Sequence, residues 1–138
     1  MFEKHAQTLI PLVGRVLLGL IFAISGFKKI LGFASTAGYM ASKGLPMTDV
    51  LLVLTILVEL GGGLMLIAGW KTCWAAVALF LFIIPTSIIF HPFWNGDAQA
   101  AMNQVQFLKN LAIMGGMLML AANGPGQWSA DRSRNAGT

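Results

Sequence analysis

One stretch of the sequence, Val50–Gly69, constrains the fold more than any other. Its twenty residues are apolar or glycine except for Thr55 and Glu59. A helix rises about 1.5 Å per residue, so this stretch would be roughly 30 Å long, the thickness of a bilayer's hydrocarbon core. Glu59 would then lie near the midplane, where a carboxylate costs about 2.5–3.5 kcal/mol. The stretch therefore predicts a transmembrane helix whose single acid faces other protein.

The composition supports a membrane environment for the whole chain. Of its 138 residues, 57% are hydrophobic and only 10% are charged, whereas a soluble domain carries roughly 25% charged residues. The net charge of +4 comes from scattered residues and forms no basic stripe, so the lipid bilayer and not nucleic acid is the expected partner. A single cysteine, Cys73, excludes a disulfide or a thiolate cluster within the chain. We therefore predict no metal site and no covalently bound cofactor.

Three further apolar runs are long enough to cross a bilayer. The predicted spans are Leu9–Phe27, Val50–Gly69, Cys73–Phe90 and Gln104–Ala122. Between the first two, the residues Ala34–Lys43 fit a short interfacial helix or a plain loop. The sequence thus predicts an all-α membrane protein, with four transmembrane helices in an up-down-up-down bundle.

The domain organisation follows from the same pattern. Residues 1–131 are predicted to form a single four-span membrane domain, and residues 132–138 a polar tail. An even number of spans places both termini on the same side of the membrane. Basic residues are nearly balanced between the two sides, so the positive-inside rule favours cytoplasmic termini only slightly.

Glu59 needs a cationic partner, and Arg15 is the first candidate. Arg15 shares a helical stripe with Gly19, Ala23 and Gly26, and small residues on one face mark the close approach of another helix. If the spans end level with one another, Arg15 lies about 10 Å and Glu59 about 15 Å from the terminal side. We therefore expect a polar core pair of Arg15 and Glu59, although Arg15 could instead snorkel to the nearer interface.

A second polar group is predicted near the opposite membrane face. The span model places Lys29, His91, Lys109 and Asn110 there, beside aromatic residues around Phe90. Hydrogen-bond donors at headgroup depth suit a quinone ring or an anionic lipid headgroup. These four residues are therefore a candidate headgroup or quinone site, and ordinary snorkelling to bulk headgroups is the alternative.

Short motifs in a fixed order extend along residues 12–131. They are Gly14-Arg15, Ser25-Gly26 with Lys29, Tyr39-Met40 before Gly44-Leu45-Pro46, Glu59-Leu60-Gly61-Gly62-Gly63, Gly69-Trp70-Lys71-Thr72, Phe90-His91, Phe107-Leu108-Lys109-Asn110-Leu111, Gly124-Pro125-Gly126, and Trp128-Ser129 with Asp131. In this order and number, the motifs resemble those of the DoxX family. The resemblance implies a four-helix protein of the bacterial inner membrane.

The resemblance also implies a functional setting. The family takes its name from a subunit associated with a membrane thiosulfate:quinone oxidoreductase, and some relatives are linked to redox complexes. It supplies no catalytic residues, so the roles of Glu59, His91 and Lys109 are inferred from their chemistry alone. One hypothesis is a redox-associated subunit that interacts with a quinone or with a membrane or soluble partner oxidoreductase. A non-enzymatic scaffold or assembly protein is the alternative, and a small transporter is disfavoured because no inverted repeat is present.

Overall fold

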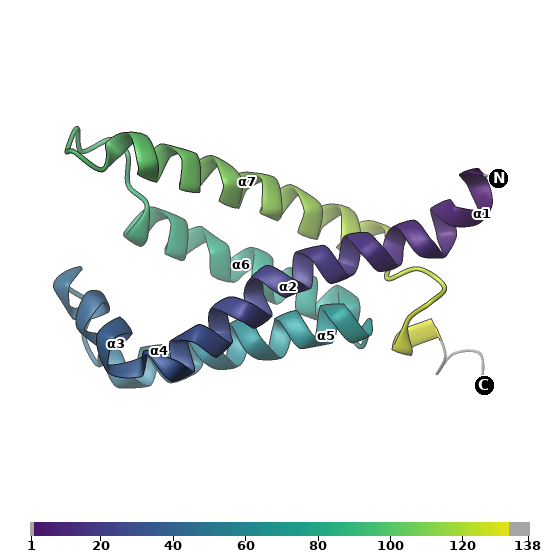
Figure 1. The fold of residues 1–138 in the computed structure, drawn as a ribbon, viewed down its shortest axis with the longest axis horizontal. Helices are drawn as coiled ribbons and strands as arrows, with labels where there is room; N and C mark the ends of the chain where they lie inside the picture. Colours follow the sequence, from purple (N-terminus) through teal and green to yellow (C-terminus); the bar gives the residue numbers. More distant parts are fainter. Residues whose placement is uncertain (1, 133–138) are drawn as a thin grey trace.

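The structure is a computed structural model that describes residues 2–132, and all of its regular elements are helical. They are α1 (Phe2–Gln7), α2 (Leu9–Leu31), α3 (Phe33–Ser42), α4 (Thr48–Ile56), the π-helical turn η1 (Leu57–Gly61), α5 (Gly62–Ala68), α6 (Thr72–Phe90) and α7 (Ala100–Asn123) (Figure 1). The elements α4, η1 and α5 form one continuous helix, Thr48–Ala68. Residues 133–138, most of the predicted polar tail, lie outside the described part of the chain.

Four helices are long and apolar enough to cross a membrane: α2, the continuous helix Thr48–Ala68, α6 and α7. They run alternately up and down, with the N-terminus and the end of α7 at one end of the molecule (Figure 1). The short helix α3 and the connection between α6 and α7 lie at the other end. The predicted all-α four-span fold is confirmed.

The boundaries of several elements differ from the predicted ones. The first span continues through Lys28 and Lys29 to Leu31, because lysine is a good helix former and no breaker occurs before Gly32. The interfacial segment between the first two spans forms the helix α3, so the loop alternative is wrong. The polar lead of the chain, Phe2–Gln7, is also helical.

The closest helix contact joins α2 to η1 and α5 through glycine. A Cβ atom added to Gly63 would lie 2.6 Å from the backbone nitrogen of Ala23, and one added to Gly19 would lie 2.7 Å from the carbonyl oxygen of Gly63. Farther along the contact, a Cβ on Gly26 would lie 2.8 Å from the backbone nitrogen of Leu60. The small-residue face predicted for the first span is confirmed, because the two backbones touch there.

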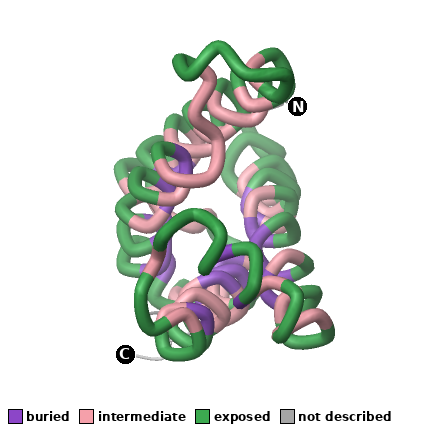
Figure 2. The backbone as a smooth tube through the Cα atoms, turned by 90° about the vertical axis from the view of Figure 1, so that its left-hand side faces the viewer, coloured by how far each residue is buried: buried purple, intermediate pink, exposed green. Residues whose placement is uncertain are grey.

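Two buried clusters fill the space between the helices. The larger joins α2, α5, α6 and α7 around Phe22, Leu66, Leu79 and Met117. The smaller, around Met40 and Leu52, lies at the α3 end. Buried positions face inward and the outer faces are exposed (Figure 2), as expected of helices whose outer surroundings are lipid.

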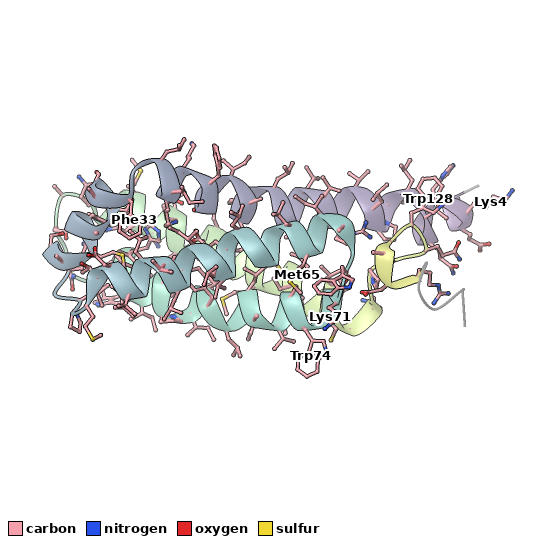
Figure 3. All side chains as sticks on the ribbon, turned by 90° about the horizontal axis from the view of Figure 1, so that it is seen from below. Lys4, Phe33, Met65, Lys71, Trp74 and Trp128 are labelled. Atoms are coloured by element: carbon pink, nitrogen blue, oxygen red, sulfur yellow. The ribbon has the colours of Figure 1, made fainter. Side chains whose placement is uncertain are left out.

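Aromatic and basic side chains mark the terminal end of the bundle. Lys4 and Trp128 lie at that end and Phe33 lies at the opposite one, whereas Lys71 and Trp74 lie between them, near the turn from α5 to α6 (Figure 3). Trp74 is 76% exposed and points away from the helices. An outward tryptophan at this height is typical of a membrane interface.

Candidate functional site

The buried acid of the second span lies in a π-helical turn. Glu59 belongs to η1 (Leu57–Gly61) and is only 5% exposed. A π turn adds one residue to the helical repeat, and single π turns inside α-helices occur frequently at functional sites. The turn places Glu59 against α2, at the level of the Gly26–Leu60 contact. The predicted burial of this acid is confirmed.

The cationic partner of Glu59 is Lys29. Lys29 Nζ lies 2.8 Å from Glu59 Oε2 and 2.7 Å from the hydroxyl oxygen of Ser25, to which it also donates. The lysine side chain is 26% exposed and the glutamate side chain 7%. Removing either partner would leave the other charge largely desolvated, so the two residues depend on each other.

The expected pair of Arg15 and Glu59 is therefore wrong. The guanidinium of Arg15 lies close to Gly69, because an added Cβ there would be 3.0 Å from Arg15 Cζ. Arg15 also contacts the Ile67 carbonyl, and Glu59 lies eight residues before Ile67 on the same helix, a separation of roughly 12 Å along the axis. The depth estimate assumed that the start of the first span lies level with the end of the second, whereas the start of α2 extends beyond the end of α5 (Figure 1).

Backbone carbonyl groups surround Arg15. The guanidinium donates to the carbonyl oxygens of Pro125, Trp128 and Ile67, the last two at 2.9 and 3.3 Å. Arg15 is only 2% exposed, so the snorkelling alternative is also wrong. Through these hydrogen bonds, Arg15 connects the segment after α7 to α2.

The same C-terminal segment contacts the start of α6. Asp131 accepts hydrogen bonds from the backbone nitrogens of Lys71 and Thr72 and from the Thr72 hydroxyl. It thereby caps a helix that lies about sixty residues earlier in the chain. Arg15 and Asp131 are structural residues in this arrangement.

A cavity of about 220 Å³ adjoins the Lys29–Glu59 ion pair at the α3 end of the bundle. Its walls come from five elements and from the residue after α6. The lining residues are Lys29, Thr36, Tyr39, Met40, Thr55, Glu59, Phe82, Thr86, Phe90 and His91. This volume is below the roughly 300–1,000 Å³ that is usual for the sites of larger ligands, so it suits a ligand with a single ring.

Two features of the cavity wall point to a ligand. The rings of Tyr39 and Phe90 are stacked, with centroids 5.6 Å apart and planes inclined by 28°. His91 Nδ1 is buried and has no hydrogen-bond partner among the described residues. A buried, unpaired polar atom costs free energy, and a bound group that pairs with it recovers that cost.

The structure brings two of the four predicted site residues together. Lys29 and His91 line the cavity. Asn110 donates instead to the Ser87 hydroxyl, at 2.8 Å, and joins α7 to α6. Lys109 is exposed on α7 and is not among the residues that line the cavity. The binding role of these residues stays a prediction.

Sequence reasoning did not assign several lining residues to the site. Thr36 and Tyr39 belong to α3, a segment for which the sequence allows either a helix or a loop, and Thr86 lies inside the apolar run Cys73–Phe90. Thr55 could have been assigned to the site from the sequence, because it lies four residues before Glu59 and therefore on the same helix face. A search for polar residues on that face would have found it.

In a comparison with known protein families, the model of the DoxX family matches residues 10–92. Two curated relatives come from Escherichia coli (strain K12). Inner membrane protein YqjF is 40% identical over 132 residues, which cover 96% of this chain and 97% of YqjF. Inner membrane protein YphA is 36% identical over 129 residues, covering 92% and 91% of the two chains.

A more distant relative is the Surfeit locus protein 4 homolog of Schizosaccharomyces pombe (strain 972 / ATCC 24843). It is 27% identical over 135 residues, which cover 96% of this chain but only 40% of that protein. No solved structure matches the chain.

Proposed function

This chain belongs to the DoxX family of multi-pass inner-membrane proteins, and we propose that it is a redox-associated subunit whose cavity binds the ring of a membrane quinone. The observation that carries the proposal is the cavity beside Lys29 and Glu59. It combines an ion pair whose glutamate is buried, an unpaired imidazole nitrogen and aromatic walls, at a size that accepts one ring. A quinone matches that combination, because its flat ring fits between aromatic side chains and its two oxygens accept hydrogen bonds.

The chemical roles follow from the hydrogen-bonding capacity of each group. Lys29 uses two of its three N–H groups within the protein, and the third can donate to a ring oxygen. His91 Nδ1 is enclosed in the cavity wall, so the imidazole must rotate about its side-chain bonds for this nitrogen to pair with the second ring oxygen. Tyr39, Phe82 and Phe90 provide the apolar contact surface for the ring.

Glu59 gives the site a proton acceptor. Quinones exchange protons as well as electrons, and a carboxylate within reach of the ring can act as a general base. The electrons would come from or go to a partner oxidoreductase, in the membrane or at its surface. In this proposal the chain holds and orients the quinone for that partner.

Substitution of His91 tests the proposal. His91→Phe removes the unpaired nitrogen but keeps an aromatic ring, so it should weaken binding of a short-chain benzoquinone about tenfold without lowering stability. His5→Phe is the matched control, because His5 is exposed on α1 at the other end of the bundle. Binding is measured by calorimetric titration of the protein in nanodiscs.

Two results would contradict the proposal. The first is a wild-type protein that binds no benzoquinone at saturating concentration. The second is equal affinity of wild type, His91→Phe and His5→Phe. Either result, together with a loss of stability when Lys29 or Glu59 is substituted, would favour a non-enzymatic scaffold in which the ion pair only joins the helices.

A further inference from the structure

Three threonines line the cavity, and all three have already used their only hydroxyl proton. Thr36 donates to the Gly32 carbonyl at 2.9 Å, Thr55 to the Leu51 carbonyl at 2.9 Å, and Thr86 to the Phe82 carbonyl at 2.8 Å. In each case the acceptor lies four residues earlier in the same chain. A threonine hydroxyl has one proton and two lone pairs, so these three groups can offer a ligand only acceptors.

The ion pair adds a fourth acceptor and a single donor. Glu59 Oε2 accepts from Lys29, and Glu59 Oε1 accepts no hydrogen bond from the described residues. Lys29 Nζ has one N–H group left. His91 and Tyr39 can act either way, because imidazole and phenol groups both donate and accept. Among the groups that can act only as a donor or only as an acceptor toward a ligand, there are therefore four acceptors, namely the three threonine hydroxyl oxygens and Glu59 Oε1. The one such donor is Lys29 Nζ.

From this imbalance we infer that the cavity binds the reduced, dihydroxy form of its ring ligand in preference to the quinone. A quinone has only carbonyl acceptors and leaves the threonines and Glu59 Oε1 without donors. A hydroquinone donates two O–H groups to those acceptors, and its oxygens still accept from Lys29. A hydrogen bond from a phenol to a carboxylate is also stronger than one between neutral groups.

The inference rests on the proposed function and specifies which form of the ligand the site holds. Such selectivity is strong when a site is built to pair with a hydroxyl group, because an analogue without that group leaves buried polar atoms unpaired. We expect the hydroquinone to bind about tenfold more tightly than the quinone, or better. A tenfold preference raises the midpoint potential of the bound two-electron couple by about 30 mV.

Three ligands that differ only at the ring oxygens test the inference. They are a benzoquinone with a short alkyl chain, its hydroquinone, and the di-O-methyl ether of that hydroquinone, titrated anaerobically against the protein in nanodiscs. The ether keeps the ring and both oxygens but has no proton to donate. The expected order of affinity is hydroquinone first, with the quinone and the ether at least tenfold weaker.

Threonine variants connect that order to the cavity. Thr55→Val and Thr86→Val each remove one acceptor and should lower the affinity for the hydroquinone severalfold more than the affinity for the quinone. Thr55→Ser should restore the preference. Thr8→Val is the matched control, because Thr8 also donates to a carbonyl four residues earlier but lies at the other end of the bundle.

The outcomes separate the two proposals. Equal affinity for hydroquinone and quinone, or equal affinity for hydroquinone and ether, would overturn the inference and leave quinone binding intact. A preference that persists in both valine variants would also overturn it. If none of the three ligands binds the wild-type protein, the proposed function fails and the inference fails with it.

Discussion

Lys29 Nζ and Glu59 Oε2 lie 2.8 Å apart, and their ion pair joins the last turn of α2 to the π turn of the second span. The contact is partly open on the lysine side and almost closed on the glutamate side. It therefore connects a residue near the membrane surface with one that lies deeper in the bundle. The contact therefore joins the two helices at the edge of the cavity.

A double-mutant cycle should show that Lys29 and Glu59 are coupled. Glu59→Leu or Lys29→Met alone should cost up to roughly 3 kcal/mol, because each leaves a charge without its partner. The double variant should recover much of the loss. Unfolding in mixed micelles, followed by circular dichroism, measures the effect. Losses that simply add up would show that the pair contributes no coupling.

The glycine contact between α2 and α5 should not tolerate a methyl group. Gly63→Ala would place its Cβ 2.6 Å from the backbone of Ala23, and overpacking of this kind costs roughly 1–3 kcal/mol. Gly115→Ala on α7 is the control, since no atom lies within 4 Å of its added Cβ. The same unfolding assay compares the two. A Gly63→Ala protein as stable as Gly115→Ala would refute the close contact.

Arg15→Lys should loosen the segment after α7. An ammonium group cannot reproduce the fork with which Arg15 reaches three carbonyl oxygens from two stretches of backbone. Hydrogen exchange of residues 124–132 should accelerate, while exchange in the middle of α6 stays slow. Arg132→Lys, at an exposed position of the same segment, serves as the control. Identical exchange in both variants would show that Arg15 does not hold the segment.

Asp131→Ala should destabilise the start of α6. The carboxylate accepts from two backbone nitrogens and one hydroxyl group there. Replacing a capping side chain by alanine typically costs about 1 kcal/mol. The thermal unfolding midpoint is the measurement. Asp49→Ala is the control, because Asp49 is exposed in the first turn of α4 and its carboxylate accepts no hydrogen bond from the described residues. An unchanged midpoint for Asp131→Ala would argue against the cap.

Reporter fusions should alternate across the membrane. Fusions after Gly44 and Gly96 should report one side, and fusions after Lys71 and residue 138 the other, because the four helices alternate in direction. The absolute result also decides whether the termini are cytoplasmic, which the balance of basic residues favours only slightly. Two consecutive fusions on the same side would contradict the four-span topology.

The spans were predictable because length and hydropathy are local properties of the sequence. The burial of Glu59 and the glycine face of α2 were predictable for the same reason, since each follows from positions on one helix. The partner of Glu59 was not. It depends on how far α2 extends beyond α5, and contacts with residues 125–128 stabilise that offset. Such contacts leave no local pattern.

The cavity was only partly predictable. Lys29 and His91 were placed at the correct end of the bundle by counting residues along the spans. Tyr39 and Thr36 reach the cavity from α3, and the folding of this short polar helix against α4 is a tertiary effect. The π turn that positions Glu59 has no known sequence signature in this chain. The contribution of α3 to the cavity and the placement of Glu59 in a π turn could therefore be identified only from the structure.

The contacts of Arg15 also determine when during biosynthesis this residue can reach its final partners. Its guanidinium enters the membrane with the first span, yet two of the carbonyl groups that bind it are 110 and 113 residues further along the chain. At usual rates of protein synthesis, the ribosome needs on the order of ten seconds to make that stretch. During this interval the nascent first helix carries a cation without its final neighbours, and the insertion machinery, water or lipid headgroups must accommodate it. Synthesis of the segment after α7 thus ends the exposure of a charge that entered the membrane with the first span.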